Sequence, residues 1–123
     1  MSKKVRIRWS KSPAVHDYPA ALSYLLLLCD GKSARAHVRR LKRVAGVEFK
    51  AKDIFRASGL SLLGVSDSHI ARDRRQIKAG RALSPLLLVR DTVRGRVIVA
   101  DGYHRLCAVY SRDEDALIPC RIV

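Results

Sequence analysis

The sequence predicts an α/β (α+β) fold in which a small mixed sheet follows a helical hairpin. Two observations support this fold class. Short apolar, β-branched runs such as Val97–Ala100 are typical of buried strands, and two capped helical segments lie within the first 46 residues. No low-complexity linker divides the 123 residues, so we expect a single domain, 1–123. Within it, 1–46 would form an N-terminal strand or arm and the hairpin, and 47–123 the core.

The first 46 residues predict an extended segment and two helices. Residues 5–9 alternate between apolar and basic side chains, which indicates a half-buried strand or an extended arm. Asp17 can cap a first helix that ends at Asp30–Gly31. Ser33 then caps a second helix that runs to about Val44, and about three residues join the two.

The second helix is strongly basic. Its apolar positions fall on one face, and no carboxylate lies between Lys32 and Val47 to offset its cations. A solvated surface and an electropositive interface both fit this pattern. In the second interpretation the helix contacts nucleic acid through Arg35, Arg39, Arg40 and Arg43.

The segment from Glu48 to Arg56 enters the predicted core, and its period fits a strand and a helix equally well. If the chain is a kinase, Glu48 is the candidate general base. Arg56 could reach a phosphate from the same segment.

A further helix is expected from 67 to 79. Ile70 and Ile77 mark its buried face, and Arg74 lies between them by helical spacing. Because a buried arginine needs a partner, Arg74 could pair with Asp73 or Asp53, or it could line an anion pocket beside Arg105. His69, near the helix start, is a candidate phosphate donor in the same pocket.

The most informative segment is Asp101–Arg105, which lies between the apolar run Val97–Ala100 and an apolar helical pattern. It predicts a strand-to-helix corner, where unpaired helix amides and the helix dipole favour an anion. Gly102 would let a ligand approach the backbone, Arg105 would bond phosphate oxygens, and Asp101 would hold a metal or accept a proton. The alternative is a structural corner in which Asp101 is a cap and Gly102 a turn residue.

This part of the sequence resembles the core of the ParB/sulfiredoxin superfamily, which includes the ParB-like nuclease domains. Members have a Pro-led strand, a strand running into a Gly-x-His-Arg corner, a helix and a final strand opening with Ile-Pro. The corresponding segments here are 84–89, 97–105 and 118–123. Tyr103 stands where sulfiredoxins have their catalytic cysteine, so the chain does not resemble a true sulfiredoxin. The Asp-Gly-Tyr-His-Arg corner is most similar to the Asp-Gly-His-x-Arg corner of the superfamily's free-serine kinases.

The resemblance implies a core of ParB/sulfiredoxin type that binds a nucleotide, ATP or ADP rather than CTP, at the corner. It leaves open whether the chain is an enzyme; if it is, Mg²⁺-dependent phosphotransfer or nucleotide hydrolysis is expected. The candidate catalytic residues are Asp101, which would also hold the metal, His104 and Glu48. The candidate nucleotide contacts are Gly102, Tyr103, His104, Arg105, Arg74, His69 and Arg56. The alternative is a non-enzymatic, basic nucleic-acid-binding protein that keeps the ParB-like fold and has lost the chemistry.

Composition limits the choice of partners and of compartment. The net charge is +14, with 25 Lys and Arg against 11 Asp and Glu, so a nucleic acid or an acidic protein is an expected partner. Cys29, Cys107 and Cys120 are widely spaced in apolar contexts, which predicts neither a disulfide framework nor a zinc cluster. The longest apolar stretch, 19–29, is too short to cross a bilayer, and no apolar signal core follows the basic start. We therefore expect a cytoplasmic protein without a membrane partner.

Overall fold

The computed structural model describes residues 6–62 and 68–123. Helices and strands follow one another in the order α1 (Asp17–Leu28), α2 (Gly31–Leu41), β1 (Val47–Lys50), α3 (Ala51–Ser58), α4 (Ser68–Lys78), β2 (Leu86–Asp91), β3 (Arg96–Asp101), α5 (Tyr103–Arg112) and β4 (Leu117–Ile122). The strands form one mixed sheet with the order β1-β4-β2-β3, in which β2 runs parallel to β4 and the other pairs are antiparallel. The predicted fold class, mixed α/β, is confirmed.

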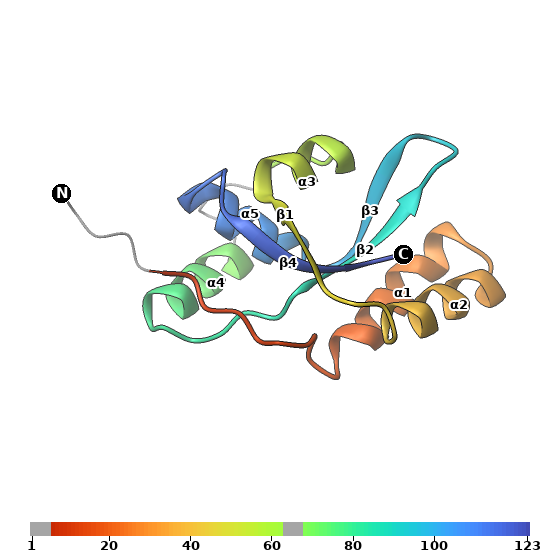
Figure 1. Ribbon diagram of the computed structural model, residues 1–123, viewed down its shortest axis with the longest axis horizontal. Helices are drawn as coiled ribbons and strands as arrows, with labels where there is room; N and C mark the ends of the chain where they lie inside the picture. Colours follow the sequence, from red (N-terminus) through yellow and green to blue (C-terminus); the bar gives the residue numbers. More distant parts are fainter. Residues whose placement is uncertain (1–5, 63–67) are drawn as a thin grey trace.

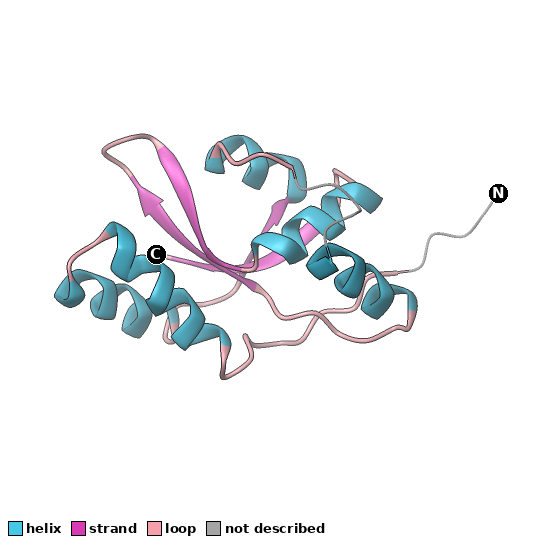
Figure 2. Ribbon diagram, turned by 180° about the vertical axis from the view of Figure 1, so that it is seen from behind, coloured by secondary structure: helices cyan, strands magenta, loops and turns pink. Residues whose placement is uncertain are grey.

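Helices cover both faces of this sheet (Figures 1 and 2). Alternate residues of a strand point to opposite faces, and the two hydrophobic clusters divide accordingly. Leu87 and Val89 of β2 pack with α1 and α2, whereas Leu86 and Leu88 pack with residues of α3, α4 and α5. Because β2 lies inside the sheet and is covered on both faces, its first four residues are buried.

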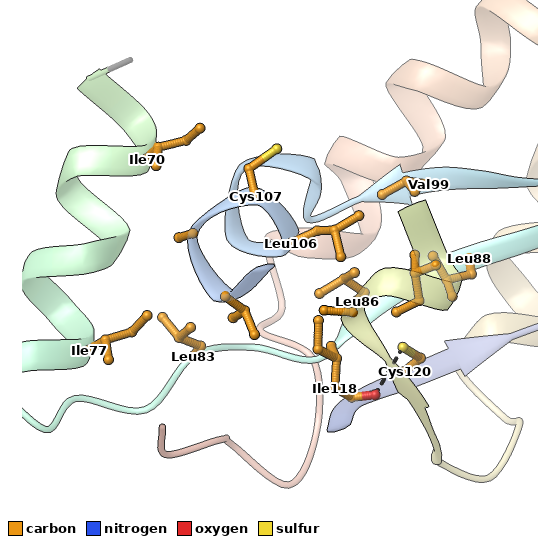
Figure 3. Packing of buried hydrophobic residues seen from close by; sticks show 14 of the residues in the cluster. Ile70, Ile77, Leu83, Leu86, Leu88, Val99, Leu106, Cys107, Ile118 and Cys120 are labelled. Atoms are coloured by element: carbon orange, nitrogen blue, oxygen red, sulfur yellow. Dashed lines mark hydrogen bonds between the residues drawn. The ribbon is translucent and has the colours of Figure 1, made fainter. Parts of the chain in front are cut away.

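The larger cluster joins α4 and α5 to the sheet. Figure 3 shows Ile70 and Ile77 on the side of α4 that faces α5, and Leu86 and Ile118 on the strands beneath; all four side chains are buried. Full burial of such a side chain contributes about 1.5–3 kcal/mol. This packing fixes the position of α4 against α5, and the candidate site lies at the start of α5, beside the first described turn of α4.

Several element boundaries differ from the prediction. Asp30, rather than Ser33, caps α2: its Oδ1 accepts a hydrogen bond from the Ser33 amide at 2.7 Å. The carboxylate reaches the third amide of the helix, as an N-cap does. The helix therefore begins at Gly31, with two residues between it and the end of α1, and it stops at Leu41 rather than at about Val44.

The ambiguous segment after residue 46 contains both kinds of structure, β1 followed directly by α3, which explains its mixed period. Near the N-terminus, Trp9 forms a single parallel bridge with Leu83, so this stretch is an extended arm. Val5 of the predicted strand and the predicted start of α4 at residue 67 lie outside the described residues.

Candidate functional site

The predicted strand-to-helix corner is present. β3 ends at Asp101, Gly102 has a φ of +106°, and α5 begins at Tyr103. A Cβ atom on Gly102 would lie 2.8 Å from Leu86 Cγ and 2.9 Å from Arg105 Nη2. Glycine is therefore required for both its left-handed backbone and its lack of a side chain. The space where a ligand was expected to approach this Cα is occupied by Leu86 and Arg105.

Arg105 is largely buried, with 17% of its side chain exposed, and bonds to other parts of the protein. Its Nε donates to the Ser84 carbonyl at 3.0 Å, and its Nη2 donates to the Pro85 carbonyl at 3.3 Å and to Asp101 Oδ2 at 3.1 Å. These bonds tie the start of α5 to the segment before β2. The Arg105 guanidinium group, which was expected to bind phosphate, is therefore hydrogen-bonded within the protein. In this structure Arg105 has a structural role.

Asp17 of α1 joins this cluster, although the sequence pattern indicated only a helix cap. Its Oδ2 lies 3.9 Å from Arg105 Nη2 and accepts a hydrogen bond from the Ala14 amide at 3.0 Å. Burial raises the pKa of Asp101; Arg105 opposes this change, and the neighbouring Asp17 carboxyl adds to it. Two acids therefore share one cation, and Asp101 holds a proton more readily than an ordinary aspartate.

These contacts do not fit the expected Mg²⁺ site. Mg²⁺ takes ionised oxygen ligands with room for water and phosphate around them, whereas Asp101 has a raised pKa and its Oδ2 accepts a bond from Arg105. Among residues 6–62 and 68–123, no group of three or more His, Cys, Asp or Glu side chains is arranged to hold a metal ion. In this structure the Asp101 carboxylate therefore bonds Arg105 and is not part of a cluster of metal ligands among the described residues.

His69 and His104, two of the predicted phosphate contacts, come together. Their ring centroids lie 4.6 Å apart with 31° between the planes, and the ring of Tyr103 lies 5.8 Å from that of His104. His69 is exposed in the first turn of α4, and His104 is half-buried in the first turn of α5. The first described turn of α4 therefore adjoins the start of α5, whose helix dipole places positive potential at the histidine pair.

The charged residue on the buried face of α4 is Asp73, not Arg74. Ile70, Asp73 and Ile77 are buried, and Asp73 is only 5% exposed. Arg74 is half-exposed and lines a shallow cleft on the helix surface with Ala71. The expectation that Arg74 is buried is wrong. Asp73 and Arg74 are the third and fourth residues after Ile70, so both lie near the helix face of Ile70, and the packing of α4 decides which of the two is buried.

Asp73 lies among the charges of the corner. Burial raises its pKa, and Arg105 gives the largest opposing effect, followed by Arg72, His104 and His69. An acid that is buried beside two imidazoles can hold a proton or accept one. Sequence reasoning considered Asp73 only as a possible ion-pair partner of Arg74 and missed its place in the site, although a carboxylate between two apolar positions of one helix face was the available signal.

Two further predicted residues lie elsewhere. Glu48 is exposed on β1, at the edge of the sheet opposite β3, with β4 and β2 between them. Arg56 is on the exposed side of α3, where its side chain is 84% accessible and lies 3.8 Å from Asp53. Strand spacing alone separates Glu48 from the strand of Asp101 by about 14 Å, so Glu48 is not positioned as a base for chemistry at the corner.

The four arginines of the predicted nucleic-acid face are all exposed on or just after α2. No described carboxylate lies within ion-pair distance of any of them. Lys42, beside them, lies over the ring of Tyr18 at 5.5 Å from its centroid. The electropositive surface is therefore not neutralised by the part of the chain that the structure describes.

Comparison of the chain with protein-family models, curated proteins and solved structures found no match. Across the described ranges, every helix is too short or too polar to cross a membrane.

Proposed function

We propose that the protein binds the phosphate groups of a nucleotide where α4 and α5 begin. The observation that supports this most directly is the pairing of His69, in the first described turn of α4, with His104 at the start of α5. Imidazole N–H groups and the first amides of a helix are hydrogen-bond donors, and the dipole of α5 favours an anion there.

The proposal gives different tasks to the residues of the corner. His69, His104 and the first amides of α5 contact the phosphates, and Tyr103 lies beside them. Arg105 is a positioning residue, which holds the start of α5 against the segment before β2 and adds positive charge. If the bound nucleotide reacts, Asp73 is the candidate proton acceptor, because it is the buried acid beside the histidine pair.

A core of ParB/sulfiredoxin type with an N-terminal helical hairpin is part of the same proposal. The order of the elements supports it: a strand after Pro85, a strand ending at Asp101, the corner, a helix, and a last strand containing Pro119. The similarity of the corner to that of the free-serine kinases favours ATP or ADP over CTP. Phosphotransfer or hydrolysis would require Mg²⁺ to arrive with the nucleotide, since no group of three or more His, Cys, Asp or Glu side chains among the described residues is arranged to hold the ion.

Calorimetry and thermal unfolding with ATP, ADP, CTP and pyrophosphate, with and without Mg²⁺, test this proposal. A ligand that binds the folded state raises the melting temperature by mass action. His69→Ala and His104→Ala should each weaken binding of the best ligand by about 10- to 100-fold, the range for a hydrogen bond to a charged group. His37→Ala, at a histidine of α2, is the matched control and should bind normally. Unchanged affinity in the folded His69 and His104 variants would refute the site.

A second candidate function is nucleic-acid binding through α2. It is favoured by one specific observation: Arg35, Arg39, Arg40 and Arg43 are exposed together without an ion-pair partner in the described part of the chain. Each phosphate that a cation neutralises releases counterions, so affinity for duplex DNA or RNA should fall steeply with salt.

Charge reversal separates the two functions. Arg39→Glu/Arg40→Glu should greatly weaken duplex binding and reduce the salt slope by about two, while nucleotide affinity stays the same. Arg75→Glu/Lys78→Glu on α4 removes the same charge elsewhere and is the control. If both double variants weaken duplex binding equally, general charge rather than α2 accounts for it.

A further inference from the structure

A cleft of about 480 Å³ follows the free edge of the sheet at β3. β3 is the last strand in the order, so one side of its backbone has no strand partner among the described residues. The cleft is lined by Val97, Ile98 and Val99. Val97 and Val99 belong to the face covered by α3, and Ile98 to the face covered by α1 and α2. A cleft lined by all three therefore straddles the edge of the strand.

Apolar side chains border this edge on both faces. Leu27 and Leu28 at the end of α1 are 82% and 52% exposed, and Leu60, just after α3, is 40% exposed. Charged residues often guard an edge strand against unwanted pairing, but exposed leucines beside it have the opposite effect. Their exposure indicates a surface that a partner covers.

The cleft is also positively charged. Arg90, Arg94 and Arg96 line it, and the single acid among the lining residues is Asp91. Asp91 is paired with Arg94, which leaves the charges of Arg90 and Arg96 unmatched within the lining: its carboxylate accepts 3.2 Å hydrogen bonds from the amide and from Nη1 of Arg94, which hold its pKa below the ordinary value. His37 also lines the cleft, and its Nδ1 is buried without a hydrogen-bond partner among residues 6–62 and 68–123. These groups complement a partner that brings negative charge and hydrogen-bonding atoms.

We propose that the β3 edge binds an extended acidic segment of a partner protein as an added strand. Backbone groups of the segment would pair with those of β3, and its alternate side chains would point to the two faces, toward Leu27 on one side and Leu60 on the other. Its carboxylates would meet Arg94 and Arg96 at the turn. A second copy of this chain does not suit the cleft, because each copy has a net charge of +14.

Selection from a displayed library of random peptides of about ten residues, the upper length of an ordinary strand, tests this proposal. Peptides that the protein enriches should alternate aliphatic residues, contain Asp or Glu and lack proline. A synthetic copy of the best peptide should bind at least about tenfold more weakly to Arg94→Glu/Arg96→Glu, as expected when an opposite charge becomes a like charge. Arg75→Glu/Lys78→Glu on α4 should bind it normally. N-methylation of the peptide backbone should abolish binding at every second position and leave it unchanged at the positions between, because only one edge of the added strand pairs with β3.

Leu27→Glu is a second variant that leaves the core untouched, since Leu27 is largely exposed; it should also lose the peptide. The proposal is overturned if the library yields no enriched peptide. It is also overturned if the best peptide binds Arg94→Glu/Arg96→Glu and Leu27→Glu as tightly as the wild type, or if N-methylation at every backbone position leaves its binding unchanged. Two other outcomes overturn the proposal in favour of another occupant. If the wild type sediments as a dimer and Leu27→Glu dissociates it, the cleft binds a second copy of the chain. If no peptide binds and Arg94→Glu/Arg96→Glu removes the affinity for duplex DNA or RNA, the cleft binds nucleic acid.

Discussion

Asp17 and Arg105 lie 3.9 Å apart, between Oδ2 and Nη2, so an ion pair joins the first turn of α1 to the first turn of α5. Both side chains are largely buried, and Arg105 also bonds Asp101 at the end of β3. The N-terminal helices are thus connected to the corner by charge as well as by apolar packing. Residues whose pattern suggested ligand binding also stabilise the tertiary structure.

Arg105→Ala should lower the free energy of unfolding by about 2–4 kcal/mol, because it leaves two buried carboxyls without their cation and two carbonyls without a donor. Urea unfolding measures this loss. Arg75→Ala, at an exposed position of α4, should change stability by less than about 0.5 kcal/mol. Equal stabilities for the two variants would mean that the network around Arg105 contributes nothing.

Gly102→Ala should destabilise the protein by about 2–4 kcal/mol. The new Cβ would combine a left-handed backbone with a 2.8 Å contact to Leu86. Gly80→Ala is the matched control, since its φ is also positive, at +72°, but nothing lies within 4 Å of its Cβ position. It should cost about 1 kcal/mol. The difference in stability loss between the two variants, measured by thermal unfolding, gives the cost of the contact with Leu86. Similar losses of stability in both variants would show that only the backbone conformation matters.

Stability should depend on pH through Asp73. Because burial raises its pKa in the folded state, the folded protein binds this proton more tightly than the unfolded chain. The resulting stability is fully present below the ordinary value of 3.8 and is lost as the pH rises through the folded pKa. Asp73→Asn does not titrate, so its free energy of unfolding should fall less than that of the wild type between about pH 4 and about pH 7.

Urea unfolding over that range measures the difference. Each unit of pKa shift corresponds to about 1.4 kcal/mol. The exposed acids titrate equally in both proteins and cancel from the comparison. Parallel pH profiles would show that Asp73 ionises as it does in the unfolded chain.

The cysteines should differ sharply in reactivity. Cys107 and Cys120 are completely buried, and burial raises the pKa of the Cys120 thiol to about 12, whereas Cys29 is half-exposed. Because the thiolate is the reactive form, an aromatic disulfide reagent at about pH 8 should label one thiol rapidly in the folded protein and three in urea. Cys29→Ser should remove the rapid phase. A rapid phase that survives this substitution would contradict the burial of the other two.

Local features of the fold could be predicted from the sequence because they depend on neighbouring residues. The β-branched run Val97–Ala100 and the glycine after Asp101 specify a strand that ends in a sharp turn, and the apolar residues after Arg105 specify a helix there. The two apolar positions Ile70 and Ile77 likewise identify the buried face of α4. In each case backbone preference and side-chain period act over a few residues.

The partners of these residues were decided only by the tertiary structure. Nothing local indicates that Asp17 reaches Arg105, that Asp73 rather than Arg74 is buried, or that His69 meets His104. These contacts join elements far apart in the chain, and they depend on which faces pack together and in what order the strands pair. The free edge of β3 follows from strand order in the same way, because a run of residues specifies a strand but does not specify its neighbours.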